Sequence, residues 1–535
     1  MALRSICGPL EGDLLVLQSK HVSTHVWNEV EERDIRVRHA RPSHGEFPRR
    51  LTQLLQKCGF GWIIQLEKIK ISKRLVLALI ERWRSETHTF HMPFGECTIT
   101  LQDIAVLTGL PVDGRPLIPT IDNPKEYVNE CLGDVPSGAN LRGLELNLGW
   151  LQDTFANPDP NVDDLFYWQR YARAWIMRYI GGVLFPDKSA STVNLRWLYY
   201  LRDFDAINSY AWGAAVLGYL YRNLCVATDY DVKNFSGYSL LLQLWVWERF
   251  PKLMPVDIPP VPVGVPIGLR WTVGTKNKLP IPDDVRSIRH VFDTMTRQDI
   301  IWQAYNPDVL TQLPEICRQG EGIWQSVCPL ISFMTYEWHQ PDRVMRQFGW
   351  QQSIPHPPMQ PAEIHFMTCR GKDPVEWQTI LCPVIEAWTR RQTTCFLQTE
   401  PQVGLLSSNS EYMRWFKKKG LPRVDPCSDP QHVMADISEQ IAYMTMPEMG
   451  NTYSYQQINN LALQQLTISQ QADRCTEALE IAPEAGDRPQ LLEINVPRSS
   501  REAQHATSRR RTANPIEHTY EAPPKRQTGM NSTPT

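Results

Sequence analysis

Three residues that lie close together in the sequence, Glu337, His339 and Asp342, have side chains that could do chemistry. Two carboxylates beside an imidazole could transfer protons or hold a metal ion. The alternative is a buried turn whose polar groups satisfy one another, with Arg343 and Arg346 as partners of the two acids. Such turns are commoner than catalytic centres, and no matching set of partner residues occurs elsewhere in the chain. We therefore favour the structural interpretation of this segment.

Motifs that would indicate a cofactor or a metal are missing from the sequence. The chain has no G-x-x-x-x-G-K-[ST] or G-x-G-x-x-G loop for phosphate and no G-x-S-x-G nucleophile turn. His21 and His25 are spaced for one face of a helix, but no adjacent Glu completes a hydrolytic zinc motif. The twelve cysteines include no C-x-x-C pair, so we expect reduced, buried thiols. These features predict a protein without a metal or a cofactor.

A strip of arginines, with His39 and His44 among them, runs through the N-terminal segment. It could be a solvated loop or an arm that contacts phosphate groups. The formal net charge of the chain is -3, so any contact with nucleic acid would have to be local. We favour the solvated loop. The arginines of the strip are Arg33, Arg36, Arg38, Arg41, Arg49 and Arg50.

The segment 88–114 is predicted to form a hairpin followed by a helix. Residues 88–92 and 97–101 alternate between apolar and polar types, which predicts two strands joined by a turn at 93–96. The apolar residues share one face, and we expect the opposite face, with its Thr and His side chains, to be exposed. Thr100 and Asp103 form a capping-box pattern that opens a helix, and Gly109 ends it.

This hairpin stands between two predicted helices, an order found in winged-helix proteins, where the hairpin can contact DNA. The face that we expect to be exposed carries Thr and His rather than Arg and Lys. A structural corner is therefore favoured over a DNA-reading wing. Direct nucleic-acid binding stays an alternative without support from these residues.

Apolar residues at helical spacing recur along the chain and predict a mainly α fold, a helical bundle with an aromatic-rich core plus short β-hairpins. Many of the eighteen tryptophans fall inside such patterns. The apolar stretch 211–220 is too short to span a membrane, so we expect a buried helix and no membrane contact. The helical stripes fall at 51–58, at 72–83 after the N-cap Ser72, at 168–179 before Gly181-Gly182, at 212–220 and at 240–245. Short strands are expected at 300–302 and 329–333, and a helix from Pro341 to Gly349.

Several long motifs resemble those of the plant mobile domain family, also labelled aminotransferase-like plant mobile domain. They are the segment 83–114, the run Leu-Leu-Leu-Gln-Leu-Trp-Val-Trp-Glu-Arg-Phe-Pro at 240–251, and the run Glu-Trp-His-Gln-Pro-Asp-Arg-Val-Met-Arg-Gln-Phe-Gly at 337–349. The resemblance covers residues 13–420. The signature residues in this chain are His88, Phe90, Pro93, Gly95, Glu96, Thr100, Leu101, Asp103, Gly109, Leu110, Pro111, Asp113, Gly114, Trp338, His339, Pro341, Asp342, Arg343, Arg346, Gln347, Phe348 and Gly349.

The resemblance implies a non-enzymatic nuclear protein-interaction module that acts in meristem maintenance and in the silencing of genes and transposons. Its implied partners are phosphatase-like or chromatin-associated proteins, and some relatives occur inside transposable elements. The aminotransferase label would require a lysine that binds pyridoxal phosphate, and neither Lys276 nor Lys278 has the surroundings of such a site. The alternative is an enzyme or a nucleic-acid-binding protein with a site around Glu337, His339 and Asp342.

Composition divides the chain into four parts. Residues 1–50 carry the basic strip, and 51–420 form the main domain, which could have two lobes joined by the Pro-rich connector 251–266. Residues 421–481 have a weak helical rhythm, with one marginal helix at 456–479. Residues 482–535 are rich in Pro, Ser, Thr, Arg and Gln, which predicts a disordered tail. The basic clusters of this tail indicate nuclear import, and their residues are Arg509, Arg510, Arg511, Lys525 and Arg526.

Overall fold

The computed structural model describes most of the chain up to residue 425. The described residues are 8–425 apart from 10, 29–32, 41–46, 119, 121–122, 188, 190, 274–277, 334, 360–373 and 397, and beyond 425 only 438, 441 and 462. Arg41, His44, Lys276, the helix predicted at 456–479 apart from residue 462, and the basic clusters of the tail lie outside them. Contacts group residues 1–480 into one unit and 481–535 into another. The two lobes on either side of 251–266 stay a prediction.

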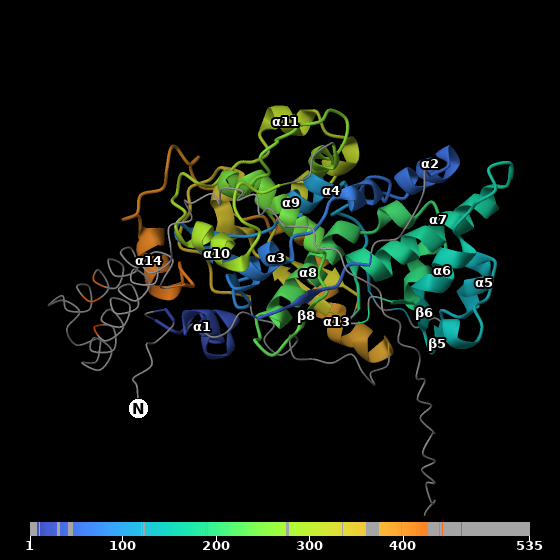
Figure 1. The fold of residues 1–535 in the computed structure, drawn as a ribbon, viewed down its shortest axis with the longest axis horizontal. Helices are drawn as coiled ribbons and strands as arrows, with labels where there is room; N and C mark the ends of the chain where they lie inside the picture. The colour runs from blue at the N-terminus through green and yellow to red at the C-terminus, as the bar shows by residue number, and fades with distance from the viewer. Residues whose placement is uncertain are drawn as a thin grey trace, which may run out of the picture. The chain divides into compact units, whose positions relative to one another are not determined.

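Helices dominate the regular structure, as the sequence predicts, and two largely buried ones lie at its centre (Figure 1). These are α8 (Trp212–Ala227) and α9 (Ser239–Arg249), and every residue of α9 is buried. Trp212, Trp245 and Trp247 are among the largest fully buried side chains, which confirms the aromatic-rich core. Other α-helices are α1 (Val22–Trp27), α2 (Arg49–Lys57), α3 (Lys73–Ile80), α4 (Leu101–Thr108), α5 (Glu126–Leu132), α6 (Leu148–Thr154), α7 (Leu165–Tyr179), α10 (Val285–Asp293), α11 (Pro307–Thr311), α13 (Pro374–Thr389) and α14 (Glu411–Lys419).

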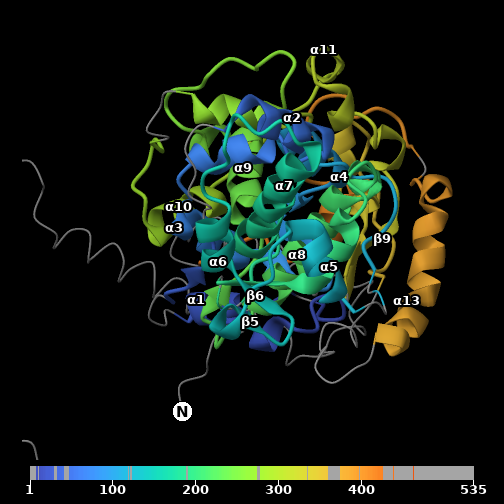
Figure 2. The same ribbon diagram turned by 90° about the vertical axis from the view of Figure 1, so that its right-hand side faces the viewer.

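Short 3-10 helices connect many of these elements. In Figures 1 and 2, α5, α6 and α7 lie together beside β5 and β6, and in Figure 1 α10 and α14 lie at the opposite end. The 3-10 helices are η1 (Gln18–Lys20), η2 (Ile63–Lys68), η3 (Gly138–Asn140), η5 (Leu195–Leu201), η6 (Ile207–Ser209), η7 (Pro251–Leu253), η8 (Ile267–Thr272), η9 (Glu315–Cys317), η10 (Glu321–Ile323), η11 (Pro341–Phe348) and η12 (Arg391–Thr393).

The end predicted for the third helical stripe, at Gly181-Gly182, is wrong. Helix α7 continues into one turn of π-helix, η4 (Ile180–Leu184), and both glycines lie inside that turn. A Cβ atom at Gly182 would lie 2.4 Å from the carbonyl oxygen of Ala40, and the Ala40 amide donates to the Gly182 carbonyl at 2.9 Å. This glycine therefore allows another segment to approach the helix rather than stopping it.

The strands form small sheets around the helices. The predicted hairpin is a three-stranded antiparallel sheet of β2 (Trp83–Arg84), β3 (Thr89–Met92) and β4 (Gly95–Cys97), in which Met92 pairs with Gly95. The turn is thus two residues long, shorter than the predicted 93–96, and the second strand ends earlier than predicted. The remaining sheets join β9 (Cys328–Ser332) to β10 (Thr335–His339), β5 (Leu141–Arg142) to β6 (Glu145–Asn147) and β7 (Thr192–Asn194), and β1 (Arg36–Val37) to β8 (Asn234–Phe235).

The face of this hairpin that was expected to be exposed is buried. Thr89, His91, Thr98 and Thr100 are each at most 3% exposed. Helix η11 packs against β4, and His91 stacks edge-on against Phe416 of α14. Segments far away in the sequence therefore cover the polar face, and its side chains need polar partners there.

One further expectation for the second half of the chain differs from the structure. No strand forms at 300–302, where the Ile301 amide donates to the Arg249 carbonyl at 2.8 Å outside any ladder. Helix α10 precedes this segment at 285–293. The connector 251–266 begins with the 3-10 turn η7 and is otherwise irregular.

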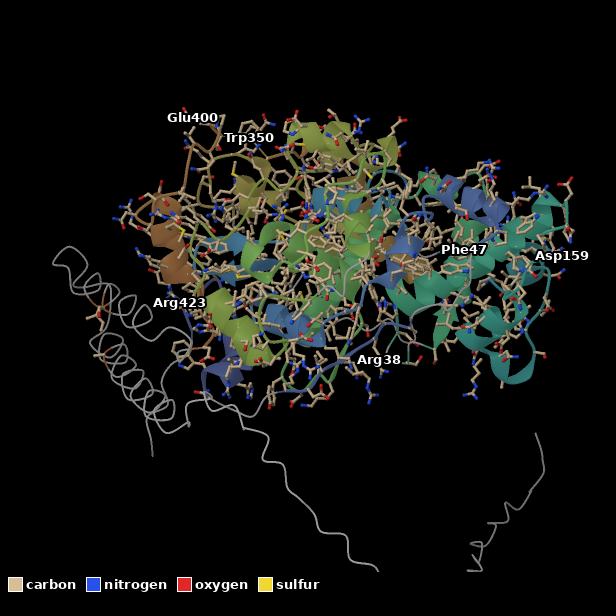
Figure 3. The ribbon with its side chains drawn as sticks, turned by 45° about the horizontal axis from the view of Figure 1, so that its top comes forward. Arg38, Phe47, Asp159, Trp350, Glu400 and Arg423 are labelled. Carbon is tan, nitrogen blue, oxygen red and sulfur yellow. The ribbon has the colours of Figure 1, made fainter. Side chains whose placement is uncertain are left out.

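Figure 3 shows Trp350 near Glu400, where the Gln351 amide donates to the Glu400 carbonyl at 2.9 Å.

Most of the described cysteines are buried, as the sequence predicts. The eight described cysteines are free thiols; five are buried and one is half-buried, whereas Cys382 and Cys395 are exposed. Within the described part of the chain, no helix is both long and apolar enough to cross a membrane.

Candidate functional site

The two main signature segments meet in the interior and form one contact. The first supplies the β3–β4 hairpin and the start of α4, and the second supplies η11. Three side chains of η11 bind the hairpin: Arg343 reaches Glu96 at 2.8 Å, Arg346 donates to the Phe94 carbonyl at 2.9 Å, and Gln347 binds the backbone beyond β4. We call this arrangement the signature contact.

Gln347 takes the place of a neighbouring strand. Its Oε1 accepts a hydrogen bond from the Thr98 amide at 2.8 Å, and its Nε2 donates to the Thr98 carbonyl at 2.8 Å. Thr98 follows directly after β4, where the pairing with β3 has ended. One amide side chain thus satisfies both backbone groups of a buried residue.

Glu96 is the centre of the signature contact. Its Oε1 accepts from Arg343 Nε at 2.9 Å and from the Thr89 hydroxyl at 3.0 Å, and its Oε2 accepts from the Tyr412 hydroxyl at 3.3 Å. Burial would raise the pKa of this carboxyl group, but Arg343 and His91 outweigh it and lower the pKa to about 2. Glu96 is therefore a buried, ionised residue with fixed partners.

Residues 411–425, which we call the C-terminal strap, cover the same polar face of the hairpin beside η11. The strap contains α14, and its Leu421 amide donates to His91 Nδ1 at 3.1 Å. Because Nδ1 accepts, the remaining proton of the neutral ring lies on Nε2, which faces Glu96 Oε1 at 3.7 Å. Burial lowers the pKa of His91 to about 4, against the opposing effect of Glu96.

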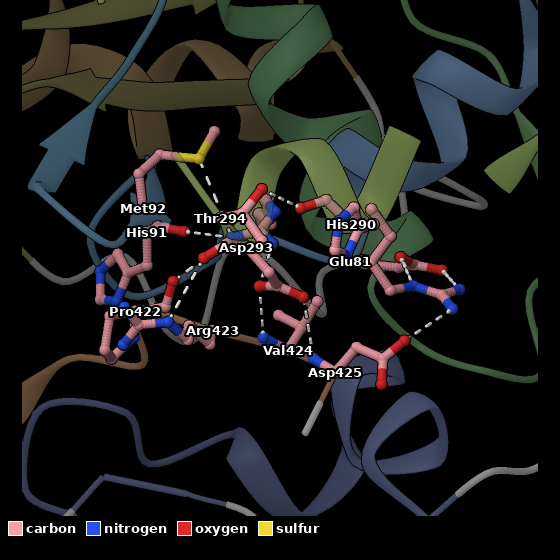
Figure 4. A network of polar contacts seen from close by, with 12 residues as sticks. Glu81, His91, Met92, His290, Asp293, Thr294, Pro422, Arg423, Val424 and Asp425 are labelled. Carbon is pink, nitrogen blue, oxygen red and sulfur yellow. Dashed lines mark hydrogen bonds and ion pairs between the residues drawn. The ribbon is translucent and has the colours of Figure 1, made fainter. Parts of the chain in front are cut away.

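The end of the strap is held by a second acid, Asp293 at the end of α10 (Figure 4). Its two carboxylate oxygens accept from the Val424 amide at 3.0 Å and from the Asp425 amide at 3.1 Å. Asp293 also forms a fully buried ion pair with Arg82. A carboxylate and an arginine that are both buried thus fix the last described segment to the domain.

Arg346 sits in an aromatic box. Its guanidinium lies 3.8 Å from the ring centre of Trp302 and 5.3 Å from that of Tyr412. Burial lowers the pKa of Arg346, although Tyr412 opposes this effect. Gly95 lies close to the same guanidinium, because a Cβ there would lie 2.5 Å from Arg346 Nη2, and its φ is +113°.

The three residues expected to do chemistry have different partners. Glu337 pairs with Arg222 at 2.5 Å and with His88 at 3.1 Å, whereas Asp342 pairs with His356 at 3.1 Å. Glu337 and His339 are fully buried, and Asp342 is 4% exposed.

The partners predicted for the two acids were wrong. Arg343 and Arg346 bind the hairpin at Glu96 and Phe94. We predicted these pairings because the residues are close in sequence, and sequence spacing gives no information about partners from distant segments.

His339 serves as a cap for helix α4. Its Nδ1 lies 2.9 Å from the Ser326 carbonyl and therefore donates, and its Nε2 accepts from the Leu101 amide at 3.4 Å. Leu101 is the first residue of α4, whose amide has no acceptor within the helix. Burial lowers the pKa of His339 to about 4, in accord with this neutral ring.

His88, unlike His339, carries a proton on both ring nitrogens. Its Nδ1 lies 3.0 Å from the Trp338 carbonyl and its Nε2 lies 3.1 Å from Glu337, so both nitrogens face acceptors and the ring is doubly protonated. Burial would lower the pKa of His88, but Cys225 and Glu337 outweigh it and raise the pKa to about 10. His88 also has a φ of +52°, which is unusual for a residue with a side chain.

Sequence reasoning missed one residue at the base of α4. Arg249 of α9 donates to Asp103 Oδ1 at 2.6 Å, and Tyr305 donates to the same oxygen at 3.1 Å. The other oxygen, Oδ2, accepts from the Thr100 amide at 2.7 Å and completes the predicted capping box. An arginine in the apolar run 240–251 was a usable signal, because a buried guanidinium needs an acid.

The two histidines with metal-ligand spacing near the N-terminus, His21 and His25, have partners within the protein. His21 accepts from the Ser23 amide at 3.0 Å and lies 2.7 Å from the Trp83 carbonyl, and His25 stacks on Tyr230. Among the described residues, no cluster of three or more His, Cys, Asp or Glu could hold a metal ion.

The basic strip is divided between buried and exposed positions. Arg33 is buried and donates to the Ala227 and Asp229 carbonyls at 2.9 Å each, whereas Arg50 pairs with the exposed Asp163 at 2.7 Å. The solvated-loop interpretation is thus wrong for Arg33.

Comparison with known proteins gives a consistent result. A family model described as "Plant mobile domain" matches residues 59–417. Among proteins of Arabidopsis thaliana, "Serine/threonine-protein phosphatase 7 long form homolog" is 36% identical over 77% of this chain and 32% of its own length, and "Protein MAIN-LIKE 2" is 33% identical over 65% and 52%. "Protein MAINTENANCE OF MERISTEMS" is 29% identical over 83% and 90%. The chain thus spans about a third of the first relative and about half of the second. No solved structure matches it.

Proposed function

The chain belongs to the plant mobile domain family, and from this premise we propose that it is a non-enzymatic nuclear protein-interaction module. Its role would be in meristem maintenance and in the silencing of genes and transposons. Its partners would be phosphatase-like or chromatin-associated proteins. The name of the relative MAINTENANCE OF MERISTEMS supports the role in meristem maintenance. The phosphatase name of another relative supports phosphatase-like partners.

The observation that carries the proposal is how the charged residues of the signature segments are used. Glu96, Asp103, Glu337 and Arg343 are all fully or nearly fully buried, and each is bound to a partner from a distant segment. A charge held in this way stabilises the arrangement of the chain and does not meet a substrate from solution. The signature therefore supports a rigid scaffold whose exposed surface is free for recognition.

The nuclear location rests on the two basic clusters of the tail, at 509–511 and 525–526. Clusters of Lys and Arg are the chemistry that import receptors read, and a chain of this kind has to enter the nucleus to meet chromatin-associated partners. This part of the proposal is independent of the folded domain, so it can be tested separately.

The test is purification of the tagged full-length chain from plant nuclei, followed by identification of the bound proteins. We expect protein or chromatin-associated partners that remain after washing. A matched variant, Arg343→Met, breaks the signature contact and should lose partners that need the folded domain, whereas Arg50→Met at the surface should keep them. Recovery of the wild-type chain from nuclei without any stable partner would overturn the proposal.

A further inference from the structure

The Pro-rich connector between η7 and η8 is displayed on the surface of the domain. Val256, Ile258 and Val263 are 63%, 56% and 73% exposed, which is high for apolar side chains. Between them runs Pro259-Pro260-Val261-Pro262, with the spacing P-x-x-P. Neither the core nor the signature contact accounts for these exposed residues.

The ends of the connector are fixed. Leu253 and Ile267 are buried on either side, the Val256 amide donates to the Lys278 carbonyl at 3.0 Å, and the Gly264 amide donates to the Gln312 carbonyl at 2.9 Å. Gln312 directly follows α11, which is labelled at the top of Figures 1 and 2. The exposed segment is therefore held at both ends rather than hanging free.

One residue on each side of the segment has polyproline II dihedral angles. Met254 has φ -70° and ψ 143°, and Pro266 has φ -57° and ψ 144°, close to the ideal values for this helix. Between Val256 and Gly264, no backbone amide donates to another described residue. Because the three prolines of 259–262 have a fixed φ and no amide proton, they favour the same conformation.

The residues of the segment differ in how far they are exposed. Val261 is half-buried and packs against the core, whereas Pro260 and Val263, which are three residues apart, are both exposed. Pro259 and Pro262, also three apart, are half-buried and still reachable from solvent. Val261 thus contacts the domain, whereas Ile258, three residues before it on the same edge, is exposed.

We infer that residues 256–263 are a docking ligand for a protein module that binds polyproline II helices in an aromatic-lined groove. Such grooves recognise the proline edges and gain affinity because the ligand is already ordered when it binds. The spacing P-x-x-P also occurs at 116–119 and 355–361, but Pro355 is buried and 119 and 361 lie outside the described residues. This inference deepens the proposed interaction role by naming the chemistry of a partner.

The experiment measures binding of the full-length chain to purified SH3, WW and EVH1 domains as probes, by surface plasmon resonance. We expect at least one class to bind, and the double variant Pro259→Ala, Pro262→Ala to bind at least tenfold more weakly. A second variant, Val263→Asp, alters only an exposed side chain and should weaken binding without affecting the fold. The matched control is Pro280→Ala, Pro282→Ala, two other prolines without the P-x-x-P spacing.

Failure of all three classes to bind, or equal affinity of the wild-type chain and the 259/262 variant, would overturn the inference. Equal loss in the 280/282 control would overturn it as well, because the effect would then not depend on the motif. These outcomes are distinct from a failure to recover partners from nuclei, since purified domains are used and no nuclear location is required.

Discussion

Arg343 and Glu96 lie 247 positions apart in the sequence and form a fully buried ion pair, with 2.8 Å between Nη2 and Oε1 and 2.9 Å between Nε and Oε1. Each belongs to a different signature segment. The pair therefore fixes where η11 lies relative to the hairpin, and its geometry suits a guanidinium better than any other side chain.

Replacing Arg343 by Met should strongly destabilise the protein. The change leaves Glu96 buried without its cation, and breaking a buried pair in this way costs about 3–5 kcal/mol. Denaturant unfolding of the full-length chain measures the effect. The matched control is Arg50→Met, which removes an exposed pair with Asp163 and should change stability by less than about 1 kcal/mol. Equal effects of the two substitutions would show that the pair at Glu96 does not hold the fold.

Acidification should weaken the hold of the strap through His91. Its pKa is about 4 in the folded protein and 6.5 for an ordinary histidine, so the unfolded chain takes up the proton first. The contribution of His91 is thus complete above pH 6.5 and is lost as the pH falls from 6.5 to 4. Protonated Nδ1 can no longer accept from the Leu421 amide.

Two measurements check this pH dependence. Hydrogen exchange of the Leu421 amide should accelerate between pH 6.5 and 4 beyond the intrinsic change in exchange rate. The free energy of unfolding of His91→Gln, which keeps an acceptor but does not titrate, should fall less steeply over the same range. The contribution of His88, whose pKa is raised to about 10, is lost only as the pH rises from 6.5 to 10, so it does not affect this window. Identical slopes for the wild type and His91→Gln would contradict the prediction.

His339→Leu should lower stability without altering metal content. The substitution leaves the Leu101 amide without its acceptor and the Ser326 carbonyl without its donor, at a cost of about 1–3 kcal/mol for each buried group. The control is His290→Leu, an exposed histidine in α10. Thermal unfolding and metal analysis are the readouts. A stable variant that had lost a bound metal ion would favour the enzyme alternative over a capping role.

Gly95→Ala should be far more damaging than Gly143→Ala. Both glycines have positive φ, +113° and +65°, so both substitutions strain the backbone, but only at Gly95 would the new Cβ meet Arg346 at 2.5 Å. Nothing lies within 4 Å of a Cβ at Gly143. We expect about 1 kcal/mol for Gly143→Ala and several times more for Gly95→Ala. Comparable unfolding midpoints would mean that the box around Arg346 can open to accept the methyl group.

The sequence predicted what depends on neighbours along the chain. Helix α4 has the predicted capping box at Thr100 and Asp103 and the predicted end at Gly109, because these signals lie within a few residues of each other. Alternation also predicted the β3–β4 hairpin. It could not predict that the polar face is buried, since the elements that cover it follow more than 240 residues later.

For the same reason, the sequence could not predict the partners of the charged signature residues. Sequence spacing assigned Arg343 to a nearby acid, but tertiary packing gives it Glu96. Composition could indicate that Arg249, within an apolar helix, needs a buried acid. It could not say that the acid is Asp103, which lies 146 positions earlier.

The tail offers a prediction that does not depend on the fold. Replacing Arg509, Arg510, Arg511, Lys525 and Arg526 by Gln in a fluorescent full-length fusion should move the protein from the nucleus toward the cytoplasm, because the charges that an import receptor would bind are gone. The matched control is Arg498→Gln, Arg501→Gln, which removes two arginines of the same tail outside the clusters. Deleting residues 500–535 should have the same effect as the five substitutions. A wholly nuclear protein after that deletion would place the import signal elsewhere in the chain, and the basic strip at 33–50 would be the next segment to test.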